Sequence, residues 1–288
     1  MKNIGTKSQI NKEMIANDFR TKKKFGQNFL VDQNILKKIV DASSITDNSL
    51  VIEIGPGMGS LTEHIMAKAK HVLAYEIDND LIPILNKNFN ESKFTLINDD
   101  FLHRNIDEDI KTLNLTYDKV AIIANLPYYI TTPIIFKVLE ESDIVSELLI
   151  MMQLEVARRI TSKPKTKDYN ALSVVIQFKT EAAIALKVPR TVFIPAPNVD
   201  SAVVKLNVIV DREIEPTNEK EFYGLVKAAF KQRRKTLVNN LHEKYHIKKS
   251  EIVEILEDAG YKGDIRAEHL EVSDFVTLSD LFTAYISR

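Results

Sequence analysis

Five residues at 125–129, Asn-Leu-Pro-Tyr-Tyr, combine an amide, a rigid turn and two aromatic rings directly after an apolar segment. The side-chain oxygen of Asn125 and a backbone carbonyl of this turn could accept the two hydrogens of an exocyclic amine on a nucleobase. Such contacts localise the nitrogen lone pair, which otherwise delocalises into the ring, and so help the amine to take up a methyl group. Pro127 stiffens the turn, and Tyr128 offers a ring on which an unstacked base can lie. Asn125, Leu126 and Tyr128 are therefore candidate catalytic residues, with an ordinary strand–turn–helix corner as the alternative.

A second aromatic candidate, Phe193, begins the stretch Phe-Ile-Pro-Ala-Pro at 193–197. Two prolines in three residues favour a stiff, extended loop before the next apolar run. The Phe193 ring could hold a base from the face opposite Tyr128. A phenylalanine of the hydrophobic core is the alternative.

Three of the eight glycines, Gly55, Gly57 and Gly59, lie between an apolar segment and a helical pattern that begins at Ser60. Glycines at this position let the chain turn sharply and let a ligand approach the backbone. A dinucleotide-binding fingerprint would require its third glycine at position 60, where this chain has serine. The spacing favours a site for a nucleoside methyl donor, and a structural turn and a nicotinamide site are the alternatives.

Acidic residues end the next two apolar segments. Glu76 closes the first, and a carboxylate at the end of a strand can accept both ribose hydroxyl protons of a ligand. Asp78 is expected to cap the following helix instead. Asp99 and Asp100 follow the second segment, and one of them could accept the amino group of a cofactor's adenine. The residues alone leave open which of these two acids points inward.

These candidates follow an alternation of apolar runs and helical patterns from Gln33 to about Val210. The expected strands are 50–54, 71–77, 94–98, 119–124, 147–153, 173–179 and 202–210. The expected helices are 33–43, 60–69, 80–88 and 132–140. Because the early runs are continuously apolar, they indicate an α/β fold with a mainly parallel, seven-stranded sheet covered on both faces.

The pattern becomes purely helical from about Glu219, over 219–242, 249–259 and 273–288. Pro216 interrupts the chain just before this region. We therefore predict two domains: residues 1–211, which carry the sheet, and a small all-helical C-terminal domain, residues 212–288.

The composition excludes several classes of protein. The 288 residues contain no cysteine, so disulfides, zinc–thiolate sites and a cysteine nucleophile are excluded, and we expect no metal site. The N-terminus is polar, and no run approaches the ~20 apolar residues that span a bilayer. We expect a soluble cytoplasmic protein without a membrane partner. Because no exposed apolar segment demands a dimer, we also expect a monomer.

Charge is distributed unevenly along a chain whose net charge is −1. Residues 227–249 hold eight lysines and arginines against one acid, whereas residues 250–288 hold nine acids against three bases. Such blocks indicate local electrostatic footprints, with solvated helix faces as the alternative.

Five motifs together resemble the family of ribosomal RNA adenine N6,N6-dimethyltransferases, in the expected order and over roughly Lys22 to Tyr261. They lie at 25–30, 53–59, 125–130, 193–201 and 230–237. The resemblance implies a Rossmann-like class I methyltransferase domain that binds S-adenosylmethionine, and a C-terminal domain that contacts RNA. It is greatest to the bacterial small-subunit branch, which implies dimethylation of two adjacent adenosines in a hairpin near the 3′ end of 16S rRNA. The partner would then be 16S rRNA in the immature, assembling 30S subunit.

The resemblance also implies roles for individual residues. Those that it assigns to the cofactor are Asn28, Leu30, Gly55, Gly57, Glu76, Asp100 and Asn125. Asp100 is preferred to Asp99 because Phe101 and Leu102 follow it as the family pattern requires. Asn125 would also contact the target amine, while Tyr128 and Phe193 would hold the target base.

A methyltransferase of structured RNA also has to bind the phosphate backbone. The basic residues expected to do so are Arg20, Lys22, Lys23, Lys24, Lys231, Arg233, Arg234 and Lys235. Lysines at 163, 165 and 167 form a third basic stretch that could contact RNA.

Three alternative functions are open. The first is the related large-subunit methyltransferase that confers macrolide resistance, which shares the cofactor and amine motifs. The second is a non-catalytic assembly factor, against which the intact motif at 125–128 argues. The third is a nicotinamide-dependent oxidoreductase, which Ser60 disfavours.

Overall fold

The computed structural model describes residues 4–17, 19, 26–89 and 92–287, and its contacts divide the chain into two compact units. The sheet unit comprises Met1–Ala157 and Ala183–Val208, and the helical unit comprises Arg158–Ala182 and Ile209–Arg288. The boundary predicted at residue 211 leaves residues 158–182 in the first domain, whereas in the structure this segment packs with the C-terminal helices. What each unit does stays a prediction.

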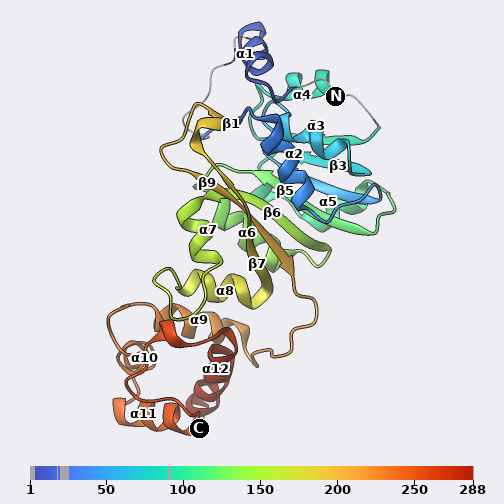
Figure 1. The fold of residues 1–288 in the computed structure, drawn as a ribbon. Coiled ribbons are helices and arrows are strands. Elements are labelled where there is room, and N and C mark those ends of the chain that lie inside the picture. Colours follow the sequence, from blue (N-terminus) through green and yellow to red (C-terminus); the bar gives the residue numbers. More distant parts are fainter. Residues whose placement is uncertain (1–3, 18, 20–25, 90–91, 288) are drawn as a thin grey trace. The chain divides into compact units, whose positions relative to one another are not determined.

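A seven-stranded sheet forms the framework of the sheet unit, in the strand order β4-β3-β2-β5-β6-β9-β7 (Figure 1). The strands are β2 (Ser49–Ile54), β3 (His71–Tyr75), β4 (Phe94–Ile97), β5 (Lys119–Asn125), β6 (Val145–Gln153), β7 (Thr180–Val188) and β9 (Ser201–Val208). The first five run parallel, and β9 is antiparallel to β6. The predicted α/β class with a mainly parallel, seven-stranded sheet is confirmed.

Strand β2 lies between β3 on one side and β5 on the other, so the winding of the chain reverses at β2. Ligands of open α/β sheets bind at such a switch point, outside the carboxyl ends of the strands. All six residues of β2 are buried, as expected for a central strand covered on both faces. The motifs at 53–59 and 125–129 both follow strands that end at this point.

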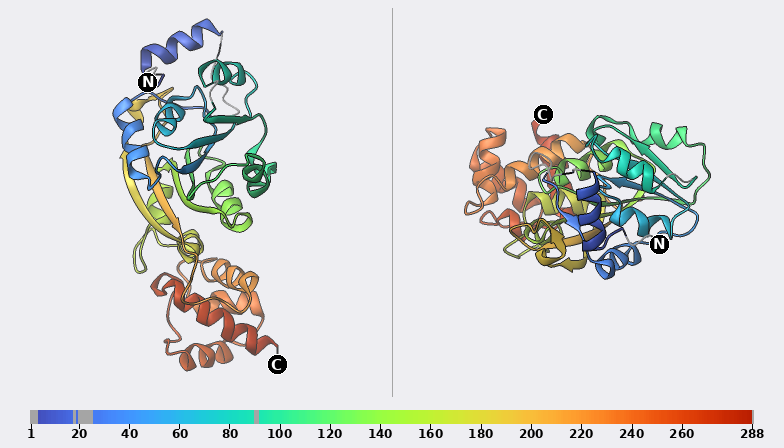
Figure 2. Two further views of the ribbon diagram at one scale, coloured as in Figure 1. Left: turned by 90° about the vertical axis from the view of Figure 1, so that its right-hand side faces the viewer. Right: turned by 90° about the horizontal axis from the view of Figure 1, so that it is seen from above.

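Helices cover both faces of the sheet. In the left view of Figure 2, α2 (Gln33–Ala42) lies on one side, and α5 (Ile106–Thr112) and α6 (Thr131–Glu141) lie on the other. Helix α2 begins where the Asp32 carboxylate accepts the N–H groups of residues 34 and 35. Its apolar residues Leu36, Ile39 and Val40 pack in one cluster with α3 (Ser60–Met66). Spacings of three and four residues place these side chains on one face of the helix.

The predicted strand at 173–179 is wrong, because these residues belong to helix α8 (Ala171–Lys179). The β-branched run in this segment favours a strand locally. However, the Asn170 side chain accepts the Leu172 N–H, and Val174 and Phe178, four residues apart, share the core of the helical unit. The seventh strand is β7, directly after α8, where partly buried and exposed residues alternate as at a sheet edge.

The helical unit has its own apolar core, which confirms the predicted C-terminal helical region. Its later helices are α9 (Glu219–Ala229), α10 (Leu237–Tyr245), α11 (Lys249–Asp258) and α12 (Val272–Ile286). Phe222, Phe275 and Phe282 are fully buried in that core. The single helix predicted over 219–242 is wrong, because the chain leaves α9 at Phe230 and restarts at the Thr236 cap. No helix in the described part of the chain is long and apolar enough to cross a bilayer.

A buried glutamate joins three strands of the sheet. The Glu147 carboxylate, fully buried on β6, lies 2.7 Å from Lys119 Nζ of β5 and 3.5 Å from Lys205 Nζ of β9. It also accepts the Ser44 N–H at 2.9 Å. Burial favours the neutral acid, but the hydrogen bonds from Lys119 and Ser44 outweigh it and lower the pKa of Glu147 below its ordinary value.

We predict that Glu147→Gln lowers the free energy of unfolding by about 1–3 kcal/mol at neutral pH, because both lysines lose their counter-charge. The pKa of Glu147 is lower in the folded protein than in the unfolded chain. The wild type should therefore be more stable than the variant at pH values above the ordinary glutamate pKa, and this difference in stability should disappear as the pH falls through the folded-state pKa. Chemical denaturation at several pH values measures the difference. Asp41→Asn, which breaks the exposed Lys37–Asp41 pair, is the control and should leave the unfolding midpoint unchanged.

Candidate active site

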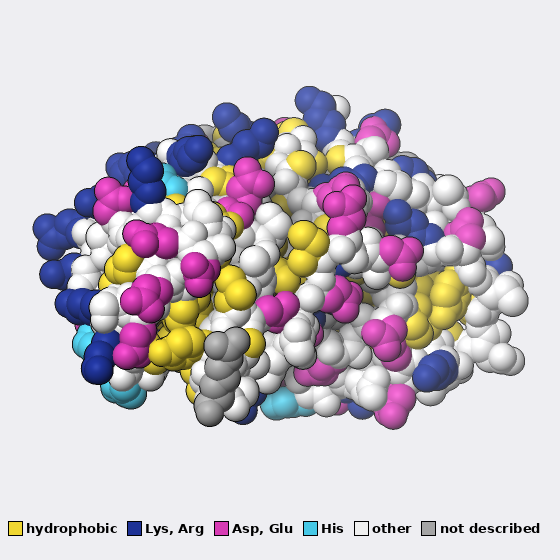
Figure 3. All heavy atoms as spheres, turned by 90° about the horizontal axis from the view of Figure 1, so that it is seen from below, with side chains coloured by type: hydrophobic (Ala, Val, Ile, Leu, Met, Phe, Trp, Pro, Cys, Tyr) yellow, Lys and Arg dark blue, Asp and Glu magenta, His cyan; other side chains and the backbone are white. Residues whose placement is uncertain are grey.

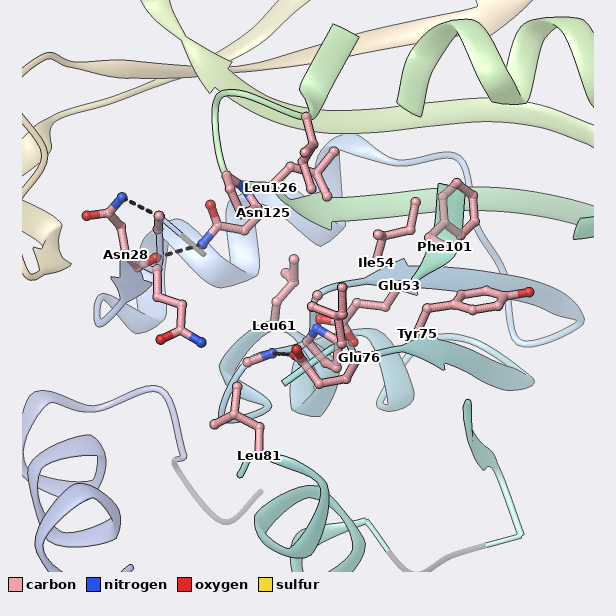
Figure 4. Close-up of a pocket in the computed structure, with 18 of the residues that line it drawn as sticks. Asn28, Glu53, Ile54, Leu61, Tyr75, Glu76, Leu81, Phe101, Asn125 and Leu126 are labelled. Carbon is pink, nitrogen blue, oxygen red and sulfur yellow. Dashed lines mark hydrogen bonds between the residues drawn. The ribbon is translucent and has the colours of Figure 1, made fainter. Parts of the chain in front are cut away.

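The carboxyl ends of β2, β3, β4 and β5 surround a cavity of about 300 Å³ (Figure 4). In Figure 4, Asn28 and Asn125 lie at one end of the cavity, Tyr75 and Phe101 lie at the other, and Glu76 lies between them. The cavity therefore extends across the switch point of the sheet. Its lining includes every sequence-predicted cofactor and catalytic residue: Asn28, Leu30, Gly55, Gly57, Glu76, Asp100, Asn125, Leu126, Tyr128 and Phe193.

The glycine loop after β2 needs two of its glycines for different reasons. Gly59 caps α3 with φ +87°, and a Cβ there would lie 2.1 Å from the Phe89 ring. Gly55 has φ +67°, but a Cβ there would meet no protein atom within 4 Å. Gly59 thus serves packing, whereas Gly55 leaves space along the cavity wall for a ligand.

Glu76 connects this loop to the end of β3. Its buried carboxylate accepts the Gly57 N–H at 3.1 Å and the Asp78 N–H at 2.9 Å. Burial raises the pKa of Glu76 to about 7, against the opposing effect of the two N–H donors. Asp78 instead accepts the Asp80 N–H and a hydrogen bond from Gln27, so its side chain is used by the turn that precedes α4 (Ile82–Asn88).

Sequence reasoning did not single out Glu53, a second carboxylate that lines the cavity. Its side chain is 1 % exposed, and no described group donates to Oε2. Burial raises the pKa of Glu53 to about 8, against the opposing effect of the nearby Thr62 hydroxyl, and the neighbouring Glu76 carboxylate adds to the rise. The sequence did contain a signal for this residue, because Glu53 is the acidic residue in the otherwise apolar strand 51–54.

The two candidate acids after β4 have different partners. The Asp99 carboxylate accepts the Asp100 N–H and pairs with Arg104 at 3.4 Å. Asp109 holds Arg104 from the other side and also accepts a hydrogen bond from Tyr75. Asp100 Oδ1 accepts the Leu102 N–H at 3.0 Å, and no group among the described residues binds Oδ2. Asp100 is thus the acid with an oxygen available to a ligand.

Asn125 ends β5 and is oriented by the segment that precedes α2. Its amide nitrogen donates to the Asn28 carbonyl at 3.2 Å (Figure 4). No described residue donates to Asn125 Oδ1, so this oxygen is left for a ligand. The half-buried Tyr128 shares a hydrogen bond of 2.8 Å with Ser201, which fixes its ring beside the turn. The arrangement can hold an amine at Asn125 next to an aromatic face.

A short two-stranded sheet brings two distant segments to the cavity. Strand β1 (Phe29–Leu30) pairs antiparallel with β8 (Phe193–Ile194), with Leu30 opposite Phe193. Phe193 is 4 % exposed and lines the cavity, so it belongs both to the core and to the site.

Two further lining residues were not predicted individually. Ile77, directly after Glu76, is 47 % exposed, and Leu102 lies beyond Asp100. An apolar residue that stays exposed beside a buried acid is suited to one face of a flat ring. The sequence could have indicated Ile77 by its position, directly after Glu76 at the end of a strand.

The predicted RNA-binding residues fall into two groups. Arg20, Lys22, Lys23 and Lys24 lie outside the described residues. The basic stretch at 231–235 lies in the helical unit, where Lys231 pairs with Glu243 at 2.7 Å and Arg233 with Glu268 at 3.0 Å. Arg234 and Lys235 are exposed, and no described carboxylate pairs with them. In Figure 3, lysine and arginine side chains gather along the left and upper edges of the face, and acidic ones lie over its middle.

Comparisons with known proteins agree on one family. The family described as ribosomal RNA adenine dimethylase matches residues 18–283. The chain is 43% identical over 286 residues to ribosomal RNA small subunit methyltransferase A of Bacillus pumilus, and 97% of each chain is covered. It is 46% identical over 268 residues to the protein of the same name from Streptococcus thermophilus, with 91% of this chain and 92% of that one covered.

Two solved structures are similar along most of the chain. A dimethyladenosine transferase from Plasmodium falciparum matches with a TM-score of 0.74 and 24% identity, over 90% of this chain and 98% of that one. The 23S rRNA methyltransferase ErmE matches with a TM-score of 0.66 and 25% identity, over 88% of this chain and 99% of that one. The first likeness supports the Rossmann-like fold.

The buried carboxylate of Glu53 generates a prediction about pH. The pKa of Glu53 is raised to about 8 in the folded protein from an ordinary value of 4.5. Between these two pH values the folded protein therefore keeps the Glu53 proton, whereas the unfolded chain has released it. The free energy of unfolding should therefore fall as the pH rises through this window. Glu53→Gln should remove that part of the fall and should be more stable than wild type by about 1–3 kcal/mol above pH ~8.

Urea denaturation of the ligand-free protein at several pH values measures this effect. Glu140→Gln, an exposed position on α6, is the matched control and should follow the wild-type curve. If Glu53→Gln showed the same pH dependence as wild type, the carboxylate would not hold a proton at neutral pH.

Proposed function

The chain belongs to the ribosomal RNA adenine dimethylase family, and on that premise we propose that it dimethylates adenosines of 16S rRNA with S-adenosylmethionine as methyl donor. The targets would be the N6 amino groups of two adjacent adenosines in a hairpin near the 3′ end. The observation that carries the proposal is that Asn125 Oδ1, which no described residue engages, lines the cavity together with the half-buried Tyr128.

The small subunit is favoured as substrate by the relatives. Those that are 43–46% identical are named small subunit methyltransferases, whereas ErmE, a 23S rRNA methyltransferase, is 25% identical. We further propose that the substrate is the immature 30S subunit in the cytoplasm, and that the protein acts as a monomer.

The cavity fits the proposed cofactor. The space beside Gly55 admits a ligand next to the backbone, and the buried Glu53 Oε2 lacks a donor among the described residues. Glu76 would accept the ribose hydroxyls, and Asp100 Oδ2 the adenine amino group, with Ile77 and Leu102 against the ring. Asn28, Leu30 and Gly55 would bind the methionine end. The bound cofactor supplies an electrophilic methyl group on a sulfonium.

The target adenine would be held at the Asn125 end of the cavity. Asn125 Oδ1 and a backbone carbonyl of the turn accept the two amino hydrogens, which localises the nitrogen lone pair toward the methyl donor. Tyr128 and Phe193 hold the ring after it has left its stack. Leu126, which is buried, fixes the backbone of the turn. The side chains orient the amine, and no strong base is required for a first transfer from a sulfonium.

The principal test measures methyl incorporation from labelled S-adenosylmethionine into undermethylated small subunits, with large subunits in parallel and nucleoside analysis of the product. We predict dimethyladenosine in the small subunit only. Asn125→Ala should reduce turnover by about 10²–10³-fold, as loss of a preorganised acceptor does. Asn34→Ala, at an exposed position of α2, is the control and should be fully active.

Label in large subunits alone would move the assignment to the large-subunit reaction. Cofactor binding without label in either substrate would contradict the catalytic proposal and support a non-catalytic assembly factor.

A second prediction separates the two acids after β4. Asp100→Asn keeps the oxygen that accepts the Leu102 N–H but presents an amide nitrogen toward the adenine amino group. It should weaken binding of S-adenosylhomocysteine by about 10–100-fold. Asp99→Asn, which weakens the partly exposed pair with Arg104, should change the affinity by less than about threefold. Isothermal titration calorimetry measures both, and the opposite order would assign the adenine contact to Asp99.

A further inference from the structure

The loop that precedes α8 presents three lysines at alternate positions. Lys163, Lys165 and Lys167 are exposed, and no carboxylate in the described part of the chain pairs with them. The other exposed residue between them is Thr166. The loop belongs to the helical unit, as does the basic stretch at 231–235.

Glu268 holds this loop beside the basic stretch. Its carbonyl accepts the Lys165 N–H at 2.7 Å, and its carboxylate pairs with Arg233 at 3.0 Å. Arg233 also donates to the Thr166 carbonyl at 3.4 Å. Two basic segments that are about 70 residues apart in sequence are thus joined, both through Glu268 and by a direct hydrogen bond.

The electrostatics of this junction favour an anionic ligand. Arg233 neutralises the Glu268 carboxylate. The three lysines of the loop, Arg234 and Lys235 then have no acidic partner among the residues that the structure describes. Like charges that lie close together repel one another. An anion of extended shape would remove that repulsion.

The backbone conformation of Lys165 is also unfavourable in free energy. Lys165 has φ +65°, in the left-handed region that favours glycine, and its N–H bond to Glu268 holds it there. Glycine would adopt this conformation at a lower free-energy cost than lysine.

We infer that Lys163, Lys165 and Lys167 form, with Arg234 and Lys235, one phosphate-binding surface for the RNA substrate. The inference rests on the proposed function, since it concerns how the same substrate is held. RNA fits better than a protein partner, because the loop offers cations without the apolar anchor on which protein interfaces depend. Such contacts position the RNA backbone and carry no base specificity.

The first experiment compares two triple variants of the full chain, each with three fewer positive charges. One replaces Lys163, Lys165 and Lys167 by alanine, and the control replaces the exposed Lys38, Lys111 and Lys220. Affinity for undermethylated small subunits and for deproteinised 16S rRNA is measured over a range of salt concentrations. We expect the loop variant to bind both at least about 10-fold more weakly, with a salt dependence shallower by roughly one unit per lost phosphate contact. The control should stay within about threefold of wild type.

Substitutions of Lys165 separate binding from folding. Lys165→Gly relieves the left-handed conformation, so its unfolding temperature should equal or exceed that of wild type while RNA affinity falls. Lys165→Arg keeps the charge and should keep the affinity.

The outcomes distinguish this inference from the proposed function. If wild type methylates small subunits and the loop variant binds like the control, the inference is wrong and the function stands. A loss with intact subunits but not with deproteinised RNA would also overturn it, since the partner would then be a ribosomal protein. If wild type neither binds nor methylates small subunits, the proposed function itself fails.

Discussion

The two hydrogen bonds to the Glu76 carboxylate are the contacts on which the cavity depends. A buried carboxylate is costly unless donors replace water, and here the Gly57 and Asp78 N–H groups do so. Because the first donor belongs to the loop after β2 and the second to the turn after β3, the carboxylate fixes both strand ends at the switch point. The glycine loop can close in this way because Gly59 accepts a conformation and a packing distance from Phe89 that other residues cannot.

The sequence was sufficient to predict the central strands and the position of the site, because both follow from local patterns. Largely apolar runs indicated β2, β3 and β5, and the motifs after them had to meet at one edge of a parallel sheet. The prediction of a strand at 173–179 was wrong for the same reason that the other strands were predicted correctly, namely that it relied on the local pattern alone. Its β-branched run resembles a strand, and only the Asn170 cap and the packing of Phe178 against Phe222 make it a helix. Tertiary packing here outweighs local propensity.

The details that decide the chemistry depend on residues far apart in sequence, and no local pattern contains them. The local sequence does not distinguish Asp99 from Asp100. In the structure they differ because Arg104, which also pairs with Asp109, pairs with Asp99 and not with Asp100. Likewise, the orientation of the Asn125 amide is set by the Asn28 carbonyl, 97 positions earlier in the chain. The pairing of β1 with β8 places that carbonyl, and it also brings Phe193 to the same cavity.

The ligand-free site is electrostatically unfavourable in a way that a cationic ligand would correct. Glu53 and Glu76 are neighbouring, buried acids whose pKa values rise to about 8 and about 7, so both ionise less readily than an exposed glutamate. A cofactor that carries a sulfonium and an ammonium charge, with ribose hydroxyls as donors, would stabilise the ionised forms and recover part of the desolvation cost. Cofactor binding and the ionisation of these two acids are then linked. The stability that the fold loses by burying the acids is recovered when the cofactor binds. The clustered lysines of the helical unit are a similar case. They have no acidic partner among the described residues, and RNA phosphates would supply the negative charge that neutralises them.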